Sequence, residues 1–503
     1  MFNPGGGTHA LYVRRDARRY SPRMKILLAS SEVHPYSKSG GLADMAGALA
    51  KSLARAGHHV GVVTPLYRGI LDEFPEIKPF DWNLDLPLGD NRVSGKVWIR
   101  EFENRLHFYF IEQPEFYDRA GLYEENGVSY PDNAERFIFL SKCVVNLARY
   151  LPWQPELVHL HDWQTALVPL LILNERLHGG WGSAPRTCLT IHNLAFQGVF
   201  PKEQFALTNL PASYFHLEAV EFFKYMNCLK AGITFADMLT TVSPRYAREI
   251  TTERFGCALD GVLRKRQNSL IGILNGVDYD EWKTEENPYL KHDYSPTDLS
   301  GKLANKIDLQ KEMGLPANPN VPLFGTVSRL ADQKGMDLQL GALEEMLSSE
   351  MQFVLLGSGS AEFEKGFRKL ASRYPQKAAV KIGFDQGLSH RIEAGSDFFL
   401  MPSKFEPCGL NQMYSLHYGA IPIVRVTGGL DDSVTDISED FEHADGIKFS
   451  EISVRALARS IRKALVLYEN KKLMAHYVRN AMQKDFSWER TTKEYEKFYR
   501  RFL

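Results

Sequence analysis

Short apolar runs alternate with helical patterns along this chain, and the alternation restricts the folds that it can adopt. In the first part of the chain such runs lie at 24–30, 59–64, 157–161, 187–191 and 238–242. Each run suits one buried parallel strand and ends in polar residues or a turn. Between the first two runs a helical pattern opens at Asp44 and ends at Gly57, which completes a βαβ unit. We therefore expect a parallel sheet covered by helices.

A second series of the same kind follows a change in composition near residue 275. Residues 280–320 are polar and rich in Pro and Asn, with a helical pattern near 302–313. Apolar runs resume at 323–326, 353–356, 379–382, 398–401 and 421–424. We expect an α/β protein with two doubly wound, Rossmann-like units, 24–275 and 276–485, that face each other across a cleft. The last helical segment, 486–503, is expected to pack back on the first unit.

Length and charge exclude several classes of protein. A chain of 503 residues is too long for one ordinary core, and its formal net charge of −1 gives no bulk attraction to nucleic acid or to an anionic membrane. No apolar run approaches a membrane span, and the five cysteines lack paired spacing, which is typical of reduced thiols in the cytoplasm. Residues 1–23 are basic and are interpreted as a flexible tail, with a plastid transit peptide as the alternative.

The most informative stretch, 398–412, joins a predicted strand to a predicted helix. Glu406 lies in the intervening turn, followed by Cys408, Gly409 and Leu410. In an open α/β sheet such a turn lies in the crevice where ligands bind, and the helix start offers free N–H groups. A carboxylate there can hold sugar hydroxyls, or it can serve only the helix terminus. The stretch alone leaves these two roles balanced.

Two further loops carry groups that suit an anionic ligand. Residues 38–44 read KSGGLAD, in which two glycines let backbone N–H groups approach a phosphate and Lys38 adds a positive charge. After the first strand of the second unit, Arg329 and Lys334 can converge on one anion, as a diphosphate leaving group requires. The alternatives are an ordinary glycine turn capped by Asp44 and two solvated cations.

Histidines and aromatic residues suggest a sugar-binding surface in the first unit. His159 and His161 alternate along one predicted strand, so both side chains point to one face. His161 lies at the functional edge, where hydrogen bonding to a substrate hydroxyl fits better than zinc, because no further ligands have suitable spacing. A structural histidine is the alternative. The loops 115–119 and 192–198 mix rings with amides and carboxylates, as a sugar-binding wall does.

Together these segments resemble bacterial glycogen synthases and plant starch synthases, which are retaining glucosyltransferases with the GT-B fold. The resemblance runs from Met24 to the C-terminus, and its six motifs occur in the family's order. The motifs are 38–44 with Ser39 in place of the usual Thr, 161–163 (HDW), 191–198 (IHNLAFQG), 275–278 (NGVD), Arg329 with Lys334, and 406–410 (EPCGL).

The resemblance implies that the first unit is the acceptor side and the second the nucleotide-sugar side. The residues implied to contact the diphosphate are Lys38, Gly40, Gly41, Arg329 and Lys334. Those implied to hold or line the glucosyl group are Tyr117, His161, Glu406, Cys408, Gly409 and Leu410. Those implied to complete the substrate site are Asp44, Asn193, Asn275 and Phe384, whose ring would stack on adenine.

The implied reaction transfers glucose from ADP-glucose to the 4-hydroxyl of an α-1,4-glucan with retention, without a metal or other cofactor. Negative charge builds on the departing diphosphate, and a preorganised Arg and Lys can stabilise it by roughly 3 kcal/mol per strong donor. The sequence offers no convincing carboxylate nucleophile, so we expect front-face displacement in which the leaving phosphate accepts the proton of the acceptor. Closure of the two units would exclude water.

Departures from the pattern leave alternatives open. Tyr414 stands where many nucleotide-sugar transferases of this fold carry a second Glu for the ribose, a lack that glycogen and starch synthases share. Asn411 replaces a Thr that is frequent in bacterial members. A UDP-glucose-using glucan synthase and a catalytically inactive glucan-binding homologue remain alternatives. An NAD-dependent oxidoreductase is disfavoured, because the glycine pattern at 357–362 is an incomplete dinucleotide fingerprint.

Overall fold

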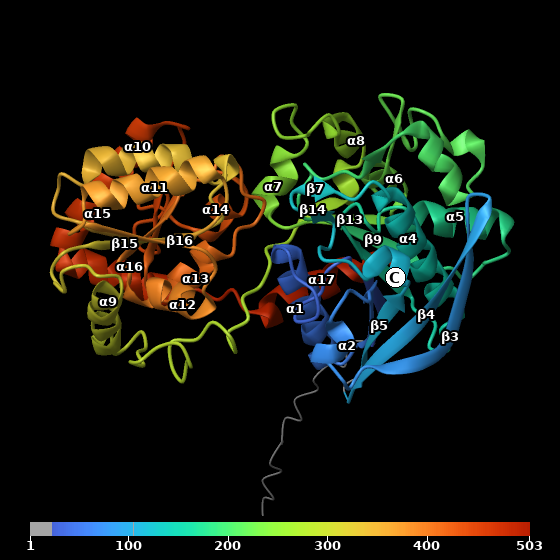
Figure 1. Ribbon diagram of the computed structural model, residues 1–503, viewed down its shortest axis with the longest axis horizontal. Coiled ribbons are helices and arrows are strands. Elements are labelled where there is room, and N and C mark those ends of the chain that lie inside the picture. The colour runs from blue at the N-terminus through green and yellow to red at the C-terminus, as the bar shows by residue number, and fades with distance from the viewer. Residues whose placement is uncertain (1–22, 104) are drawn as a thin grey trace, which may run out of the picture.

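The computed structural model describes residues 23–103 and 105–503, which form two α/β units lying side by side. In Figure 1 the N-terminal unit runs from blue to green, and the C-terminal unit runs from yellow to red. The two doubly wound units expected from the sequence are present. The predicted basic tail, 1–23, lies outside the described residues except for Arg23. Within the described ranges, no helix combines the length and the apolar character needed to cross a membrane.

The N-terminal unit is built around a nine-stranded sheet. All neighbouring strands from β14 to β5 are parallel, whereas β4 runs antiparallel to both β5 and β3 at the outer edge. In spatial order the strands are β14 (Leu270–Gly272), β13 (Met238–Thr241), β9 (Arg186–Ile191), β8 (Leu157–His161), β1 (Lys25–Ala29), β2 (His59–Pro65), β5 (Leu106–Glu112), β4 (Asn91–Phe102) and β3 (Lys78–Leu88).

Helices surround this sheet, and the first of them carries the glycine motif at its start. Helix α1 begins at Gly41, earlier than the expected start at Asp44, and Asp44 lies in its first turn, where a carboxylate favours the helix dipole. The helices of the unit are α1 (Gly41–Arg55), α2 (Ile70–Glu73), α3 (Pro114–Tyr117), α4 (Asn133–Tyr150), α5 (Val168–His178), α6 (Cys228–Phe235), α7 (Pro244–Glu249) and α8 (Asp260–Lys265). Short strands outside the main sheet are β6 (Glu124–Glu125), β7 (Val128–Ser129), β10 (Val199–Phe200), β11 (Glu221–Phe222) and β12 (Tyr225–Asn227).

The C-terminal unit contains a six-stranded, fully parallel sheet. In spatial order its strands are β17 (Ala378–Ile382), β16 (Gln352–Gly357), β15 (Leu323–Val327), β18 (Phe398–Met401), β19 (Ile421–Arg425) and β20 (Ile447–Phe449). Its helices are α9 (Ser300–Glu312), α10 (Met336–Met346), α11 (Ala361–Arg373), α12 (Gln386–Gly395), α13 (Asn411–His417), α14 (Gly428–Ser433), α15 (Val454–Glu469) and α16 (Lys471–Gln483).

Each sheet has one point where the strand order reverses, and these points locate the functional edge. In the first sheet β1 lies between β2 and β8, and in the second β15 lies between β16 and β18. The loops that leave neighbouring strands at such a reversal diverge, which opens a crevice at the carboxyl ends of the strands. The glycine motif follows β1, and Glu406 follows β18. Both motifs therefore lie at a reversal point.

The last helix, α17 (Trp488–Tyr499), returns to the N-terminal unit. In Figure 1 it is the red helix beside the blue α1, apart from the other red and orange elements. Its Glu496 accepts from Nε2 of His58 at 2.6 Å, and the hydroxyl of its Tyr499 bonds Nδ1 of His159 at 2.8 Å. The chain thus crosses between the units twice, and the crossing segments bond each other where the N–H of Val277 donates to the carbonyl of Phe486 at 2.7 Å.

Candidate active site

The C-terminal unit brings Glu406 and Lys334 together. Nζ of Lys334, which lies in a short turn after β15, is 2.5 Å from Oε2 of Glu406. The hydroxyl of Ser403 donates to the same oxygen at 3.0 Å. Among the described residues, no hydrogen bond reaches the second oxygen, Oε1. Glu406 is buried, so this carboxylate presents one paired and one open oxygen in a confined place.

Arg329 supplies a second cation at the same strand end. It follows β15 within two residues, and its side chain is exposed. No ion pair holds its guanidinium within the ranges that the structure describes. An exposed, unengaged guanidinium next to the Lys334 turn is available to an anionic ligand.

The turn after Glu406 is shaped by Gly409. Its φ of +73° lies in the left-handed region, and a Cβ there would lie 2.4 Å from Oε1 of Gln412. The side-chain amide of Gln412 donates back to the carbonyls of Cys408 and Gly409 at 3.1 and 3.0 Å. These bonds turn the two carbonyls toward Gln412, and the chain then enters α13 at Asn411. Only glycine combines this backbone conformation with this close approach.

In the N-terminal unit, a buried carboxylate organises the glycine motif. The carboxylate of Glu32 accepts the backbone N–H and the hydroxyl of Ser39, and the N–H of Gly40 at 3.2 Å. The hydroxyl of Tyr123 adds a further bond to it at 2.7 Å. The N–H of Gly40, which was predicted to face the diphosphate, is therefore bonded to Glu32 in this structure. An ion pair of 2.7 Å joins Lys38, the first residue of the motif, to Asp44, its last.

The two units meet at the start of α1 and the start of α13. A side chain at Gly41 would come within 3.8 Å of Cδ1 of Leu410, so the glycine motif faces the Glu406 turn. Burial raises the pKa of the Cys408 thiol to about 12, and a backbone hydrogen bond from Asn275 partly offsets this rise. Residues from both units thus approach the same turn.

The histidine that reaches the surface is His192 rather than His161. His161 is fully buried, and its Nδ1 lies 3.1 Å from Nε2 of His192. His192 is partly exposed just after β9. Burial lowers the pKa of His192 to about 3 and that of His161 well below its ordinary value. Both imidazoles are therefore neutral near pH 7.

Asp162 fixes the loop that carries His192. Its φ of +56° is unusual for a residue other than glycine and marks a strained position at the end of β8. Its Oδ1 accepts the backbone N–H of His192 at 2.7 Å. Burial raises the pKa of the Asp162 carboxyl to about 7, and backbone hydrogen bonds from His192 and Asn193 offset part of this rise.

Comparison with known proteins gives a consistent result. The starch synthase catalytic domain matches residues 25–265, and the glycosyl transferases group 1 domain matches residues 309–484. The chain is 47% identical over 481 residues to glycogen synthase from Anaeromyxobacter sp. (strain Fw109-5), covering 95% of this chain and 99% of the relative. Glycogen synthase 1 from Geobacter sulfurreducens is 44% identical, covering 96% of this chain and 97% of the relative. The chain belongs to the glycogen and starch synthase family.

Solved structures agree with this family and with the GT-B fold. The catalytic domain of starch synthase IV from Arabidopsis thaliana, bound to ADP and acarbose, matches with a TM-score of 0.85 and 32% identity, covering 95% of this chain and 99% of that domain. Sucrose-phosphate synthase from Thermosynechococcus elongatus matches with a TM-score of 0.57 at 17% identity, which supports the fold alone. This family member is therefore a glycosyltransferase with the GT-B fold.

The remaining predicted site residues of this family member lie in different surroundings. Phe384 is 92% exposed and follows Gly383 at the end of β17, so its ring is free to stack. Asn275 is buried, and no partner among the described residues reaches its Oδ1. Asn193 is partly exposed, and its Oδ1 accepts the N–H of Ala195 at 3.0 Å.

Tyr117 is the predicted residue that lies farthest from the expected role. It is fully buried, and its hydroxyl donates to the carbonyl of Arg136 at 2.8 Å. Burial raises its pKa well above the ordinary value for tyrosine. In this structure its side chain supports the interior of the N-terminal unit and does not line a surface.

Tyr414, which replaces the second Glu of related transferases, is used for packing. Its ring stacks on Trp282 with centroids 3.8 Å apart, and Trp282 stacks in turn on His390 at 4.1 Å. Burial raises the Tyr414 pKa, and the nearby carboxylates of Asp44 and Glu281 raise it further. Through Trp282, the segment after residue 275 is therefore packed against Tyr414 of α13 and His390 of α12.

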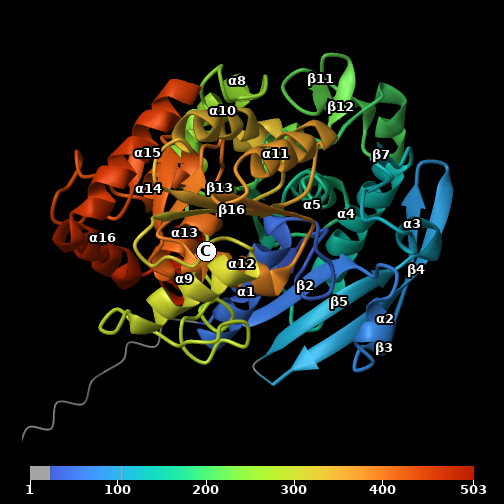
Figure 2. The same ribbon diagram turned by 60° about the vertical axis from the view of Figure 1, so that its left-hand side comes forward.

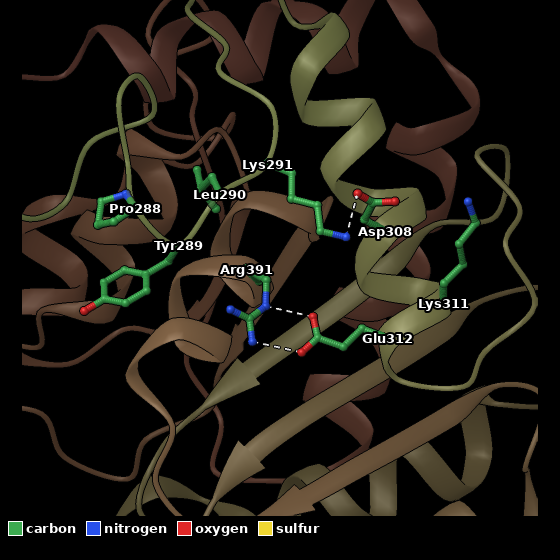
Figure 3. Close-up of a pocket in the computed structure, with 8 residues that line it drawn as sticks. All are labelled: Pro288, Tyr289, Leu290, Lys291, Asp308, Lys311, Glu312 and Arg391. Carbon is green, nitrogen blue, oxygen red and sulfur yellow. Dashed lines mark hydrogen bonds and ion pairs between the residues drawn. The ribbon is translucent and has the colours of Figure 1, made fainter.

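A separate groove of about 680 Å³ lies elsewhere in the C-terminal unit (Figure 3). Four of its charged side chains form two ion pairs. Arg391 donates two hydrogen bonds to the carboxylate of Glu312, at 2.7 and 2.8 Å, and Nζ of Lys291 lies 3.4 Å from Oδ2 of Asp308. Its lining residues are Pro288, Tyr289, Leu290, Lys291, Asp308, Lys311, Glu312 and Arg391. None of the predicted site residues lines it, so the residues around Glu406 remain the candidate active site.

Within the described ranges, no group of three or more His, Cys, Asp or Glu side chains is arranged to hold a metal ion.

Proposed function

We propose that this protein transfers glucose from ADP-glucose to the non-reducing 4-hydroxyl of an α-1,4-glucan, with retention of configuration. The observation that carries the proposal is the 2.5 Å ion pair of Lys334 with Glu406, at a reversal point opposite the glycine motif. A glucosyl group there would meet a carboxylate for its hydroxyls and a cation for its leaving group. The related starch synthase IV domain is bound to ADP and acarbose, which supports an adenine nucleotide donor.

The donor diphosphate would lie between the cations that follow β15. The exposed Arg329 is open to it, whereas Lys334 would share its charge between Glu406 and a phosphate oxygen. The N–H of Gly41 and the ammonium of Lys38 would approach from the other unit. The exposed ring of Phe384 would stack on adenine, since a flat unpaired ring at a strand end can cover a base.

The glucosyl group would be held by the Glu406 turn. Oε1 of Glu406 would accept a sugar hydroxyl, and the N–H groups of Cys408, Gly409 and Leu410 would face the donor. On the opposite wall, His161 would bind near the glucose 6-hydroxyl, since its Nε2 has no hydrogen-bond partner among the described residues. His192, which is partly exposed and lies 3.1 Å from Nδ1 of His161, would flank it.

The proposed reaction is a front-face displacement. The bond from glucose C1 to the diphosphate oxygen breaks, and a bond from C1 to the acceptor 4-oxygen forms on the same face. The proton of the acceptor hydroxyl passes to the oxygen of the departing diphosphate. Arg329 and Lys334 would stabilise the charge on that oxygen, each by roughly 3 kcal/mol if they act like strong oxyanion donors.

In this proposal the only binding partners of the protein are its two substrates. ADP-glucose and an α-1,4-glucan are the ligands, and no metal, organic cofactor, nucleic acid or membrane takes part. We place the reaction in the cytoplasm. A plastid location corresponds to the alternative interpretation of residues 1–23, most of which lie outside the described part of the chain.

A transfer assay tests the proposal directly. Purified protein is offered radiolabelled ADP-glucose or UDP-glucose with a glycogen primer, and label in the precipitated glucan is counted. We expect incorporation from ADP-glucose well above that from UDP-glucose. A preference for UDP-glucose would replace the donor, and no incorporation from either donor by well-folded protein would indicate an inactive glucan-binding homologue.

A further inference from the structure

The turn that carries Glu406 is also held by the N-terminal unit. Ser243, the residue that caps α7, is fully buried, and its hydroxyl donates to the carbonyl of Pro407 at 2.7 Å. Pro407 directly follows Glu406. Because α7 belongs to the N-terminal unit and Pro407 to the C-terminal unit, this bond crosses between the units beside the candidate active site. Figure 1 shows α7 and α14 as the elements that face each other across this boundary.

The other end of α7 binds the segment that lies against the same turn. The carboxylate of Glu249 accepts the backbone N–H of Gly428 at 3.1 Å to Oε2 and 3.2 Å to Oε1, and its side chain is 11% exposed. The next residue, Gly429, donates its N–H to the carbonyl of Glu406 at 3.2 Å. Two hydrogen bonds therefore connect Glu249 to the backbone of Glu406.

The contact between α14 and the Glu406 turn has no flexible side chain in it. A Cβ at Gly428 would lie 2.0 Å from the carbonyl oxygen of Glu406, and a Cβ at Gly429 would lie 2.0 Å from that of Cys408. Backbone therefore packs directly on backbone. If the start of α14 moves, no side chain between the two segments can rotate to make room. The backbone of the Glu406 turn would therefore move with it.

Charged groups hold α7 in register with α14. The guanidinium of Arg245 bonds Oε1 of Glu249 at 2.9 Å and Oδ2 of Asp431 at 2.6 Å. The backbone N–H of Arg245 donates to Asp432 at 2.6 Å. The side chains of Arg245, Glu249 and Asp431 are at least two-thirds buried, and Asp432 is partly buried. Glu249 thus lies at the centre of a contact that joins both units.

We propose that Glu249 is a positioning residue, which seats the start of α14 and through it the Glu406 turn when the two units form the reactive cleft. The inference rests on the proposed glucosyl transfer. An error of about 1 Å in the placement of a reacting group can cost about 100-fold in rate. Binding of the nucleotide depends instead on Arg329, Lys334 and Phe384, which Glu249 does not touch. Loss of Glu249 therefore lowers turnover and leaves ADP affinity nearly unchanged.

Three variants of the full-length protein test this. Glu249→Ala is expected to lower kcat by roughly 10- to 100-fold, with the Kd for ADP, measured by calorimetry, within about twofold of wild type. Glu249→Gln keeps an acceptor for the N–H of Gly428 and is expected to recover most of kcat. Ser243→Ala removes the second bond to the same turn, so its effect on kcat should not add to that of Glu249→Ala in a double-mutant cycle.

Glu496→Ala is the matched control. Glu496 is a carboxylate with 21% exposure that joins α17 to His58, away from the turn, so its loss should lower the melting temperature without lowering kcat. Wild-type kcat in Glu249→Ala, or additive effects of Ser243→Ala, would overturn the inference. If Glu249→Ala does not fold, Glu249→Met replaces it, because Met keeps most of the side-chain volume but offers no acceptor oxygen to the N–H of Gly428; the same results would support or overturn the inference. An inactive wild type would instead refute the proposed function.

Discussion

At the residue scale, the unequal environment of the two Glu406 oxygens suggests how this carboxylate works. Oε2 is held by Lys334 at 2.5 Å and by the hydroxyl of Ser403 at 3.0 Å. Within the described residues, Oε1 has no hydrogen-bond donor. A carboxylate fixed on one side and open on the other is suited to orient a hydroxyl. Its partner Lys334 is equally suited to move toward a charged leaving group.

Replacing Glu406 should therefore affect turnover more than nucleotide binding. In Glu406→Ala the glucosyl hydroxyls lose their acceptor, while Lys334 and Arg329 remain free to hold the diphosphate. We expect kcat to fall by about 10²- to 10³-fold, by analogy with the loss of one strong transition-state contact, with little change in the Kd for ADP. Steady-state transfer assays and calorimetry with ADP measure the two quantities.

Glu312→Ala provides the control for Glu406→Ala. It also removes a carboxylate paired with a cation, Arg391, but in the groove of Figure 3, which none of the proposed site residues lines. Its kcat should equal that of wild type. Unchanged turnover in Glu406→Ala, with ADP binding intact, would remove Glu406 from the reaction.

Some site residues could be predicted because they follow the end of a strand. Others could not, because their roles depend on hydrogen bonds to backbone groups that the sequence does not specify. Lys334 and Glu406 follow β15 and β18, so the sequence alone placed them at one edge. Glu32 and Asp162 also follow strands, but their roles depend on bonds to the N–H groups of other loops, which no residue pattern specifies. For His161 the strand pattern shows which face the side chain takes but not how deeply it is buried, and its role stays a prediction.

At the element scale, burial along the whole strand explains most of the predicted strands, although β5, which is buried almost throughout, was not among them. The strands near the centre of each sheet are buried along almost their whole length and are mainly apolar, as helices on both faces require. The edge strand β3 alternates exposed with partly buried or buried residues, and with β4 it forms an antiparallel extension of the sheet. Because β3 carries Asp and Asn between its apolar residues, it does not form the continuous apolar run that predicts a buried strand.

The turn between β18 and α13 gives a test of backbone geometry. Gly409 and Gly314 have φ of +73° and +72°, but a Cβ at Gly409 would lie 2.4 Å from Gln412, whereas nothing lies within 4 Å at Gly314. Gly314→Ala should lower the free energy of unfolding by about 1 kcal/mol and leave kcat unchanged. Gly409→Ala should cost more stability and also lower kcat, since the clash displaces the turn. Equal stability losses in the two variants, measured by urea unfolding, would contradict this account.

Helix α17 is joined to the N-terminal unit by bonds that can be removed one at a time. Tyr499→Phe deletes only the hydroxyl that bonds Nδ1 of His159 and leaves a buried imidazole nitrogen without its partner. We expect the free energy of unfolding to fall by about 1–3 kcal/mol. Tyr150→Phe, at a residue that is 57% exposed, should cause no measurable change. Equal stability of both variants would show that the bond contributes nothing.

At the scale of the whole molecule, burial of neutral imidazoles recurs in both units. Burial lowers the pKa of His159 in the N-terminal unit to about 3, and that of His390 and His417 in the C-terminal unit to about 4. Each of these rings packs against an aromatic side chain, as His417 does on Tyr279 with centroids 4.3 Å apart. The interior of both units therefore excludes the charged form of histidine.

Stability should consequently fall when the protein is acidified. In the unfolded chain each histidine returns to a pKa of about 6.5, so between about pH 6.5 and about pH 4 the unfolded state binds more protons than the native state. Stability is complete above this window and is lost as the pH falls through it. One such histidine changes the free energy of unfolding by up to about 1.4 kcal/mol per pH unit. Urea unfolding at several pH values measures this slope.

His417→Gln should make the slope shallower by about one proton, because the variant has no imidazole to protonate on unfolding. Tyr279→Phe is the control. It deletes the hydroxyl that accepts the N–H of Phe486 at 3.0 Å, so it lowers stability without removing a group that titrates in this window. Its stability should fall by the same amount at every pH. A slope in His417→Gln equal to that of wild type would mean that the ring is already protonated, or already hydrated, in the folded protein.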